Sequence, residues 1–441
     1  MNHVKLHEAF PLLPGLRVRA VIDTDALVEN YRTLLAPVQA VSPNTYPIAV
    51  VKADAYGHGI RPVVSALLSA GCRSFAVACL EEAVALRRLL RELLTGTVSD
   101  RDTDILVLGY TDPKNAPILS LYHIATALLS EEYAHTLLNC AREAKVTVRG
   151  HIALDTGMNR IGFPAHSDGE IEDAVAAIQR LHAVGRPADG MPTDGLPAGG
   201  QGGGEGGLIL DGLFTHFARA DEDYDGQMNT PDSLTMTQYA RYRRVLTALE
   251  KLHIRPRVCH VCNSAASVRF PTACPEGCLD AVRLGINLYG YGVNYPENRG
   301  VTCMKPTMKL ETVVTHVHTL LPGETVGYGG SYAAKTPRTI ATLPVGYADG
   351  WLRAFSGADV RLHTCNGDVT APIVGRICMD QCMVDVTGLP VTVGTPVTLF
   401  GETSAELEAL AERAGTIPYE LLCLITARVP RVYRSGNDRA L

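Results

Sequence analysis

Pro47-Ile-Ala-Val-Val-Lys-Ala-Asp-Ala-Tyr-Gly-His-Gly59 joins a short apolar run to a loop that contains two glycines. An apolar run of this length is typical of a buried strand, so Lys52 is expected at the mouth of that strand. Partial desolvation lowers the pKa of a lysine there and leaves some neutral amine, which can form a Schiff base with an aldehyde cofactor. The alternative is a lysine that ends a strand and extends its charge into water.

The alternation of apolar run and helix continues along the chain on both sides of Lys52. Most runs are separated by amphipathic stretches such as Leu80-Glu-Glu-Ala-Val-Ala-Leu-Arg-Arg-Leu-Leu90, with apolar residues at three- and four-residue spacing. Eight strands close a barrel, so the pattern predicts an α/β protein with a parallel (β/α)8 TIM-like barrel in an N-terminal domain of residues 1–304. The eight runs begin near Ile48, Phe75, Ile105, Ile124, Val146, Ile209, Val258 and Val282.

Beyond residue 305 the pattern changes to short alternating runs such as Leu310-Glu-Thr-Val-Val-Thr-His-Val-His318, interrupted by glycines. Such runs are typical of strands, so we expect a mostly β C-terminal domain of residues 305–441. A strand-like run, Val18-Arg-Ala-Val-Ile-Asp23, precedes the first barrel helix. Residues 1–24 could therefore pair with the C-terminal domain.

Residues 185–207 are rich in glycine and proline. A segment of this composition buries too little apolar area to offset the roughly 1 to 2 kcal/mol per residue that ordering the backbone costs, so we expect it to be flexible. It connects a predicted helix to a predicted strand at the amino-terminal face of the barrel. Active sites of this fold lie at the opposite face, so no catalytic role is expected.

The composition is that of an ordinary globular protein, with 46% hydrophobic and 20% charged residues among 441. A net charge of -6 gives no reason to expect nucleic acid or an anionic membrane as a partner. The N-terminus lacks the apolar core of a signal peptide, and no run is apolar for long enough to span a bilayer. A cytoplasmic location is the expectation that follows.

The twelve cysteines are interpreted as reduced thiols, because a large core needs no disulfides. Cys259-x-x-Cys262 followed by Cys274-x-x-x-Cys278 resembles zinc-ligand spacing. Against a zinc site, Cys259 and Cys262 fall in a strand-like run, where residues three apart point to opposite faces. We therefore expect no metal.

Three loops carry reactive groups to the carboxyl-terminal end of the predicted barrel. Lys52 ends the first strand, Asn263-Ser264 follows the seventh, and Arg283-Leu-Gly-Ile286 ends the eighth. Barrels commonly bind phosphate at the loops after strands seven and eight, where glycine leaves backbone N–H groups accessible. An amine together with a phosphate cradle predicts a site for pyridoxal 5'-phosphate.

These stretches, and others that follow in order through both predicted domains, resemble the alanine racemase family. The resemblance implies a fold-type III pyridoxal phosphate enzyme, an isomerase that interconverts L- and D-alanine. The matching motifs are Val51–Gly59, Asp155-Thr-Gly-Met-Asn-Arg-Ile-Gly162, Phe214–Asp221, Asn263-Ser-Ala-Ala266, Val282–Ile286, Val326-Gly-Tyr-Gly329, Pro344–Gly350, Gly375-Arg-Ile-Cys-Met-Asp-Gln381 and Pro418-Tyr419.

The resemblance implies that Lys52 carries the cofactor and is one of two acid/base groups, with Tyr328 as the other. Racemisation needs groups on opposed faces of the substrate, because a proton leaves Cα on one side and returns on the other. Lys52 would serve the D enantiomer and Tyr328 the L enantiomer. Tyr328 would come from the neighbouring subunit of a homodimer, with both active sites at the interface.

Arg283 matches the residue that faces the pyridine nitrogen of the cofactor. A guanidinium stays protonated and donates, which leaves that nitrogen without a proton, weakens the electron sink and favours racemisation over transamination. His216 would orient Arg283, with His260 behind it. The resemblance also implies phosphate contacts from Tyr56, Ser264, Gly285, Ile286 and Tyr419, contacts of Arg160 with the cofactor's phenolic oxygen and the substrate carboxylate, and approach of the partner's Met379 and Asp380.

One position departs from the family pattern. Many members have a carbamylated lysine two positions before the Asp-Thr-Gly-Met motif, where this chain has Ala153. Arg160 would then be held by an anion such as chloride, by water or by another side chain. Two alternatives remain: a serine or broad-specificity amino acid racemase, and a pyridoxal phosphate-binding barrel without racemase activity. Arg283 disfavours a decarboxylase, whose chemistry benefits from a protonated pyridine.

Overall fold

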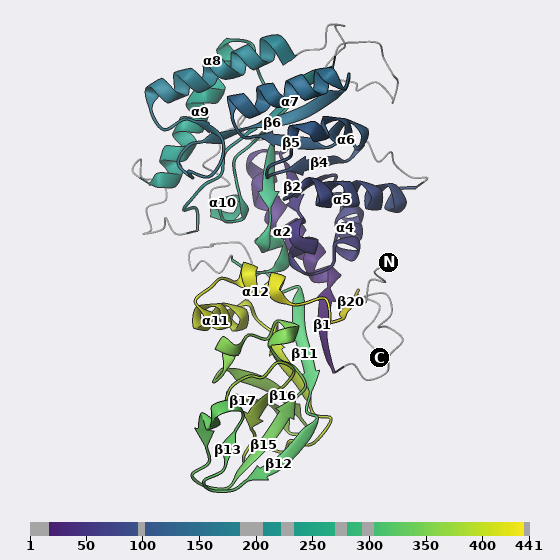
Figure 1. Ribbon diagram of the computed structural model, residues 1–441, viewed down its shortest axis with the longest axis vertical. Helices are drawn as coiled ribbons and strands as arrows, with labels where there is room; N and C mark the ends of the chain where they lie inside the picture. The colour runs from purple at the N-terminus through teal and green to yellow at the C-terminus, as the bar shows by residue number, and fades with distance from the viewer. Residues whose placement is uncertain are drawn as a thin grey trace.

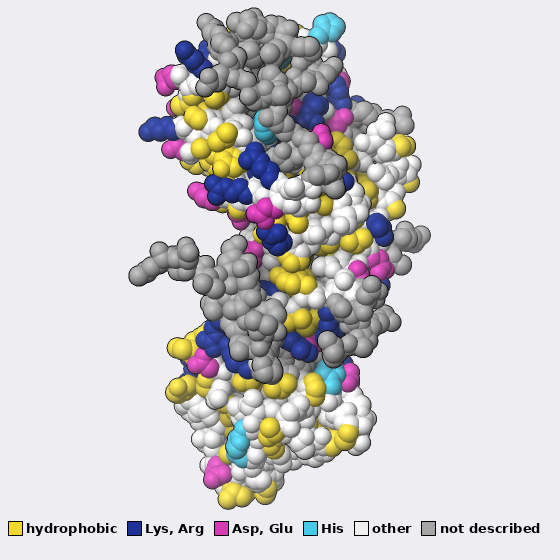
Figure 2. Space-filling view, turned by 90° about the vertical axis from the view of Figure 1, so that its right-hand side faces the viewer, with side chains coloured by type: hydrophobic (Ala, Val, Ile, Leu, Met, Phe, Trp, Pro, Cys, Tyr) yellow, Lys and Arg dark blue, Asp and Glu magenta, His cyan; other side chains and the backbone are white. Residues whose placement is uncertain are grey.

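The computed structural model describes residues 17–95, 102–185, 206–221, 233–269, 280–292 and 304–435. Figure 1 shows a helix-covered barrel at one end of the long axis and a strand-rich unit at the other. Within the described ranges, no helix combines the length and the apolar character that crossing a membrane requires. On the face drawn in Figure 2, acidic and basic side chains are interspersed.

Eight parallel strands form a closed ring at the centre of the barrel. Each strand pairs in parallel with the next, β10 pairs with β2, and the pairing of β5 with β6 completes the ring. The predicted fold class is confirmed, and each of the eight apolar runs corresponds to one strand. The strands are β2 (Tyr46–Val50), β3 (Ser74–Val77), β4 (Asp104–Val107), β5 (Ala125–Leu128), β6 (Thr147–Asp155), β8 (Gly207–Phe214), β9 (Val258–His260) and β10 (Ala281–Leu284).

Helices cover the outside of the ring, and their sequences explain where they begin and which face they bury. Ser130 caps α7, because its Oγ accepts a hydrogen bond of 3.1 Å from the backbone N–H of Tyr133. In α5, the buried face includes Ala83, Leu86 and Leu90. The outer helices are α2 (Thr24–Val41), α4 (Ile60–Ser69), α5 (Leu80–Leu93), α6 (Ala116–Leu121), α7 (Glu131–Glu143), α8 (Asp168–Gly185), α9 (Leu234–Lys251) and α10 (Ser264–Arg269).

The C-terminal unit is built on a separate sheet of nine strands, in the order β12-β15-β18-β17-β16-β19-β11-β1-β20. Along β11 buried and half-buried residues alternate, as expected for a strand with one face on a core. Its strands are β1 (Val18–Asp23), β11 (Met308–Val313), β12 (His316–Leu320), β15 (Arg338–Leu343), β16 (Asp359–Thr364), β17 (Gly367–Val374), β18 (Cys382–Asp385), β19 (Pro396–Phe400) and β20 (Arg431–Arg434), with the helices α11 (Ser404–Ala414) and α12 (Pro418–Leu424) beside them.

β1, from the start of the chain, lies inside this C-terminal sheet. It pairs antiparallel with β11 and parallel with β20. Just before it, Arg17 donates two hydrogen bonds to the buried carboxylate of Asp349, at 2.6 and 3.0 Å. A domain boundary near residue 304 remains a prediction. The predicted flexible insertion lies almost entirely at residues 186–205, outside the described residues, and Cys274 and Cys278 also lie outside them.

Candidate active site

Lys52 directly follows β2 and Val51, at the carboxyl-terminal end of the barrel, and its side chain is half-buried. Burial lowers the pKa of the Lys52 amine, and the positive charge of Arg160 lowers it further, while Cys423 and Glu82 act in the opposite direction. A lowered pKa leaves a larger share of neutral amine. Lys52 therefore has the environment of a nucleophilic lysine.

The chain turns left-handed immediately after Lys52, within α3 (Lys52–Tyr56). Residues 53–56 all have φ between 52° and 56°, although none of them is glycine. Left-handed conformation costs roughly 1 to 2 kcal/mol per residue, so surrounding contacts must hold the turn. Glu82 accepts hydrogen bonds from the backbone N–H groups of Ala53 at 2.7 Å and of Ala78 at 2.8 Å, and Asp54 accepts one from Ile60 at 2.8 Å. These contacts fix the direction in which Lys52 leaves the barrel.

Tyr56, Ser264 and Gly285 meet beside this turn. The N–H of Gly285 donates to Ser264 Oγ at 2.9 Å. A Cβ added at Gly285 would lie 2.9 Å from both Ser264 Oγ and Tyr56 Oη, so only glycine leaves the space between these hydroxyls open. Two hydroxyls around a position without a side chain form a cradle that fits a phosphate group.

The last two predicted phosphate contacts lie next to the same cradle. The centroids of the Tyr56 and Tyr419 rings are 6.3 Å apart. A Cβ added at Gly292, where φ is 69°, would lie 3.1 Å from Ile286 Cγ2 and 3.7 Å from Tyr419 Oη. The structure thus brings together all five residues predicted to contact phosphate.

Arg283 lies buried in the floor of the site, only 3% exposed. Its Nη2 donates to the carbonyl oxygens of Thr215 at 2.8 Å and of Val261 at 3.0 Å. Its Nη1 donates to Nδ1 of His260 at 2.7 Å, and its guanidinium lies 5.5 Å from the centroid of the Phe214 ring. Burial lowers the pKa of Arg283 to about 10, so it stays protonated near neutral pH. The side chain is therefore a fixed cation.

His216 lies among cations at the same end of the barrel. Burial lowers the pKa of His216 to about 3, and the charges of Arg283, Arg160 and Lys52 contribute in the same direction. Three cations around one neutral imidazole favour the binding of an anionic ligand. A phosphorylated cofactor and a substrate carboxylate would supply such charge.

Ala153 provides no polar partner for Arg160. It packs with Ala127 and Phe214 in a small apolar cluster. Arg160 itself is exposed, in the loop that follows β6.

Among the contacts of the described residues, none joins Lys52 to Tyr328, Met379 or Asp380. Tyr328 and Met379 are 69% and 52% exposed, and Asp380 pairs with Arg428 at 2.7 Å. Tyr328 directly follows β13 (Thr325–Val326) and Gly327, and Figure 1 shows β13 at the end of the C-terminal unit farthest from the barrel. A site that combines Lys52 with Tyr328 would need a second copy of the chain.

Sequence reasoning missed two groups beside Lys52. Glu82 lies in an amphipathic stretch that gives no sign of a role at the site, because its bonds to Ala53 and Ala78 depend on how neighbouring strands align. Cys423, on α12, lies near Lys52. Burial raises the pKa of the Cys423 thiol, and the positive charge of the Lys52 ammonium opposes this effect. The sequence feature that could have pointed to Cys423 is its four-residue spacing from Tyr419, which puts both side chains on one face of a helix.

Comparisons with known proteins find similarity over almost the full chain. The family models "Alanine racemase, N-terminal domain" and "Alanine racemase, C-terminal domain" match residues 22–187 with 190–293 and residues 307–433. Alanine racemase 1 of Clostridium acetobutylicum is 37% identical over 429 residues, 96% of each chain. The structure of alanine racemase from Clostridium difficile 630 is similar with a TM-score of 0.75 and 31% identity, covering 96% of this chain and 97% of that chain. A histidine racemase from Leuconostoc mesenteroides subsp. sake gives a TM-score of 0.73 and 28% identity, covering 96% and 99%.

Proposed function

This chain belongs to the alanine racemase family and is an isomerase, and we propose that it uses pyridoxal 5'-phosphate to interconvert L- and D-alanine by a two-base route. The observation that carries the proposal is the convergence of three features at one end of the barrel. These are the desolvated amine of Lys52, the cradle around Gly285 and the buried guanidinium of Arg283.

The residues of the site fit the cofactor by their chemistry. Lys52 would hold it covalently, Tyr56, Ser264, Gly285, Ile286 and Tyr419 would bind its phosphate, and Arg283 would face its ring nitrogen. When bound, the cofactor would withdraw electrons from the substrate Cα and so acidify the Cα proton. Because Arg283 can only donate and is held rigidly, it would keep the ring nitrogen unprotonated, which favours racemisation over transamination.

Two side chains would then move the Cα proton. Lys52 would take or return it on the face used by D-alanine, and Tyr328 of the partner subunit on the face used by L-alanine. Arg160 would bind the substrate carboxylate, with Met379 of the partner subunit closing the pocket. His216 and His260 would support Arg283, and Asp380 would act behind Met379 through its ion pair with Arg428.

The proposal includes a homodimer with both active sites at the interface. It is supported by the exposure of Tyr328, Met379 and Tyr347, at 69%, 52% and 42%. Tyr347 lies beside Met379, since its N–H donates to the carbonyl of Cys378. The supply of D-alanine for peptidoglycan remains a prediction that rests on the family, and a cytoplasmic location remains a prediction from the sequence.

The substrate is tested by a racemisation assay across alanine, serine, lysine and histidine. Histidine is included because a histidine racemase is among the similar structures. Turnover of alanine well above the other three would support the proposal. Comparable turnover of serine or another amino acid would favour the broad-specificity alternative, and turnover of none would favour a pyridoxal phosphate-binding barrel without racemase activity.

The attachment of the cofactor is tested by reducing the loaded protein with borohydride and mapping the labelled peptide. The label should be found on Lys52, and Lys52→Ala should lose both the visible absorbance of the cofactor and activity. A label on another lysine, or a yellow and active Lys52→Ala variant, would contradict the assignment.

A further inference from the structure

Arg283 is the first member of a buried chain of polar groups that runs through the barrel interior. Its Nη1 lies 2.7 Å from Nδ1 of His260. Nε2 of His260 lies 2.9 Å from Nδ1 of His151, in the middle of β6. Nε2 of His151 lies 3.6 Å from Oδ2 of Asp211, on β8. The chain thus leads from the carboxyl-terminal end of the barrel, where the candidate active site lies, towards the opposite end.

The donors and acceptors along this chain can point in only one direction. Arginine has no acceptor, so Nδ1 of His260 must be bare and its proton must be on Nε2. That N–H in turn requires a bare Nδ1 on His151, whose proton is then on Nε2 and faces the Asp211 carboxylate. Burial lowers the pKa of His260 well below its usual value, in agreement with a neutral ring. Both histidines are therefore neutral, with one defined tautomer each.

The backbone is shaped to receive the His151 ring. A Cβ added at Gly212 would lie 2.2 Å from Nδ1 of His151, so a side chain at residue 212 would collide with the ring. The pairing of β6 with β8 shifts between Gly150 and His151, where Leu210 and Gly212 are the partners and Asp211 is the extra residue. Such a bulge redirects a side chain, here the Asp211 carboxylate.

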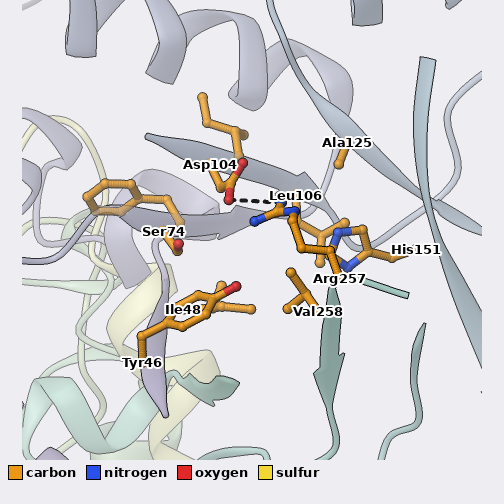
Figure 3. Close-up of a pocket in the computed structure, with 11 residues that line it drawn as sticks. Tyr46, Ile48, Ser74, Asp104, Leu106, Ala125, His151, Arg257 and Val258 are labelled. Carbon is orange, nitrogen blue, oxygen red and sulfur yellow. Dashed lines mark hydrogen bonds and ion pairs between the residues drawn. The ribbon is translucent and has the colours of Figure 1, made fainter. Parts of the chain in front are cut away.

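Asp211 is held at the amino-terminal mouth of the barrel by two arginines. Arg257 contacts both of its carboxylate oxygens, at 2.9 and 2.8 Å, and Arg149 lies 3.4 Å away. The same arginines bind Asp104, at 3.2 and 2.8 Å. Figure 3 shows Arg257 reaching towards Asp104 with the His151 ring beside it. The negative charges of the two carboxylates balance the positive charges of the two guanidiniums. Among the described contacts of this cluster, only Asp211 interacts with His151.

We propose that Asp211 is a positioning residue for the racemase reaction: through His151 and His260 it fixes the hydrogen-bond direction that anchors Arg283 beneath the cofactor ring. The inference rests on the proposed function. Asp211 and His151 contact neither cofactor nor substrate. They act by keeping a bare nitrogen of His260 available to the arginine, so that the guanidinium stays in place to donate to the cofactor.

Asp211→Ala tests the chain, with Asp104→Ala as the matched control. Each variant removes one carboxylate from the same two arginines and leaves the cluster with one extra positive charge. In Asp211→Ala no carboxylate remains opposite Nε2 of His151, and the two arginines offer only donors, which favours a bare Nε2 and reverses the tautomer. In Asp104→Ala the Asp211 carboxylate still faces His151.

The first measurement needs neither cofactor nor activity. Spectra of protein with ¹⁵N-labelled histidine distinguish protonated from bare imidazole nitrogens. For His151 and His260 we expect protonated Nε2 and bare Nδ1 in the wild type and in Asp104→Ala, and a changed pattern in Asp211→Ala. A proton on Nδ1 of His260 in the wild type, or the same pattern in all three proteins, would overturn the proposal.

The second measurement compares two fates of substrate in the loaded enzyme. The ratio of transamination to racemisation does not depend on how much of the protein is folded or loaded. We expect this ratio to rise about tenfold or more in Asp211→Ala and in His151→Phe, a second variant that leaves the ion cluster in place, and to stay within about twofold in Asp104→Ala. Equal changes in Asp104→Ala and Asp211→Ala would overturn the proposal. A wild-type protein that racemises no amino acid would refute the proposed function, and the histidine spectra would still decide on the chain.

Discussion

At the scale of single residues, Gly285 gives the sharpest test of the phosphate cradle. Gly285→Ala would bring a methyl group within 2.9 Å of the Ser264 and Tyr56 hydroxyls, closer than normal contact allows. The methyl group would occupy the space proposed for the phosphate, so we expect cofactor affinity to fall at least about tenfold, or about 1.4 kcal/mol. Titration of the cofactor-free protein with pyridoxal 5'-phosphate measures the change.

Gly169→Ala is the control for this substitution. A Cβ at Gly169, in the first turn of α8, meets nothing within 4 Å. Its affinity for the cofactor should equal that of the wild type. If Gly285→Ala bound the cofactor equally well, the phosphate would have to bind elsewhere.

Tyr328→Phe tests the second base. Loss of the hydroxyl should slow exchange of the Cα proton of L-alanine with solvent by about a hundredfold or more, the usual contribution of a general base. Exchange from D-alanine, which we assign to Lys52, should change far less. Deuterium incorporation from heavy water, followed for each enantiomer separately, measures both rates. Equal losses for the two enantiomers would remove the assignment.

Residues on the barrel rim could be predicted from the sequence, and the contact between His151 and Asp211 inside the barrel could not. Counting apolar runs is enough to put Lys52 and Ser264 at the same end of a barrel, because strand order fixes which loops are neighbours. The contact of His151 with Asp211 depends on a bulge that shifts the strand register by one residue. No pattern of apolar residues marks such a shift, and Gly212 was its only visible sign.

At the scale of elements, we expect the left-handed turn after Lys52 to be strained, and we expect a glycine in the turn to relieve part of that strain. Ala53 has φ of 52° and an exposed side chain. Ala53→Gly removes the steric cost of the left-handed conformation but raises the conformational entropy of the unfolded chain. The first effect is larger, so we expect the free energy of unfolding to rise by about 0.5 to 1 kcal/mol. Thermal or denaturant unfolding of the two proteins measures this difference.

Ala409→Gly provides the opposite case. Ala409 is also exposed, but it lies in the middle of the right-handed helix α11. There glycine should destabilise the protein by about 1 kcal/mol. Two alanine-to-glycine changes with the same sign would mean that the turn at Ala53 is not strained.

The same turn marks a limit of sequence reasoning at this scale. Lys-Ala-Asp-Ala-Tyr contains no glycine, and propensity alone favours a right-handed conformation for each of these residues. The handedness depends on distant contacts, above all the two hydrogen bonds that Glu82 accepts. By contrast, the strands and outer helices follow from local periodicity, which is why they could be predicted.

At the scale of the whole molecule, mixing two inactive variants tests whether active sites are shared between subunits. In a heterodimer of Lys52→Ala and Tyr328→Phe chains, one site has lost both groups and the other has kept both. Random reassociation after mild unfolding should therefore recover about a quarter of wild-type activity. Each variant treated alone is the control, and no recovery in the mixture would mean that each subunit supplies both groups itself.

The position of β1 has a consequence for how the protein is made. Thr312 donates a hydrogen bond to the carbonyl of Arg17, 295 residues earlier, and β1 is also flanked by β20 near the end of the chain. During synthesis this first strand leaves the ribosome long before either neighbour exists, while the barrel can close behind it. Cutting the gene between the two units would therefore give a C-terminal fragment with a missing inner strand and two newly unpaired edges, prone to aggregate.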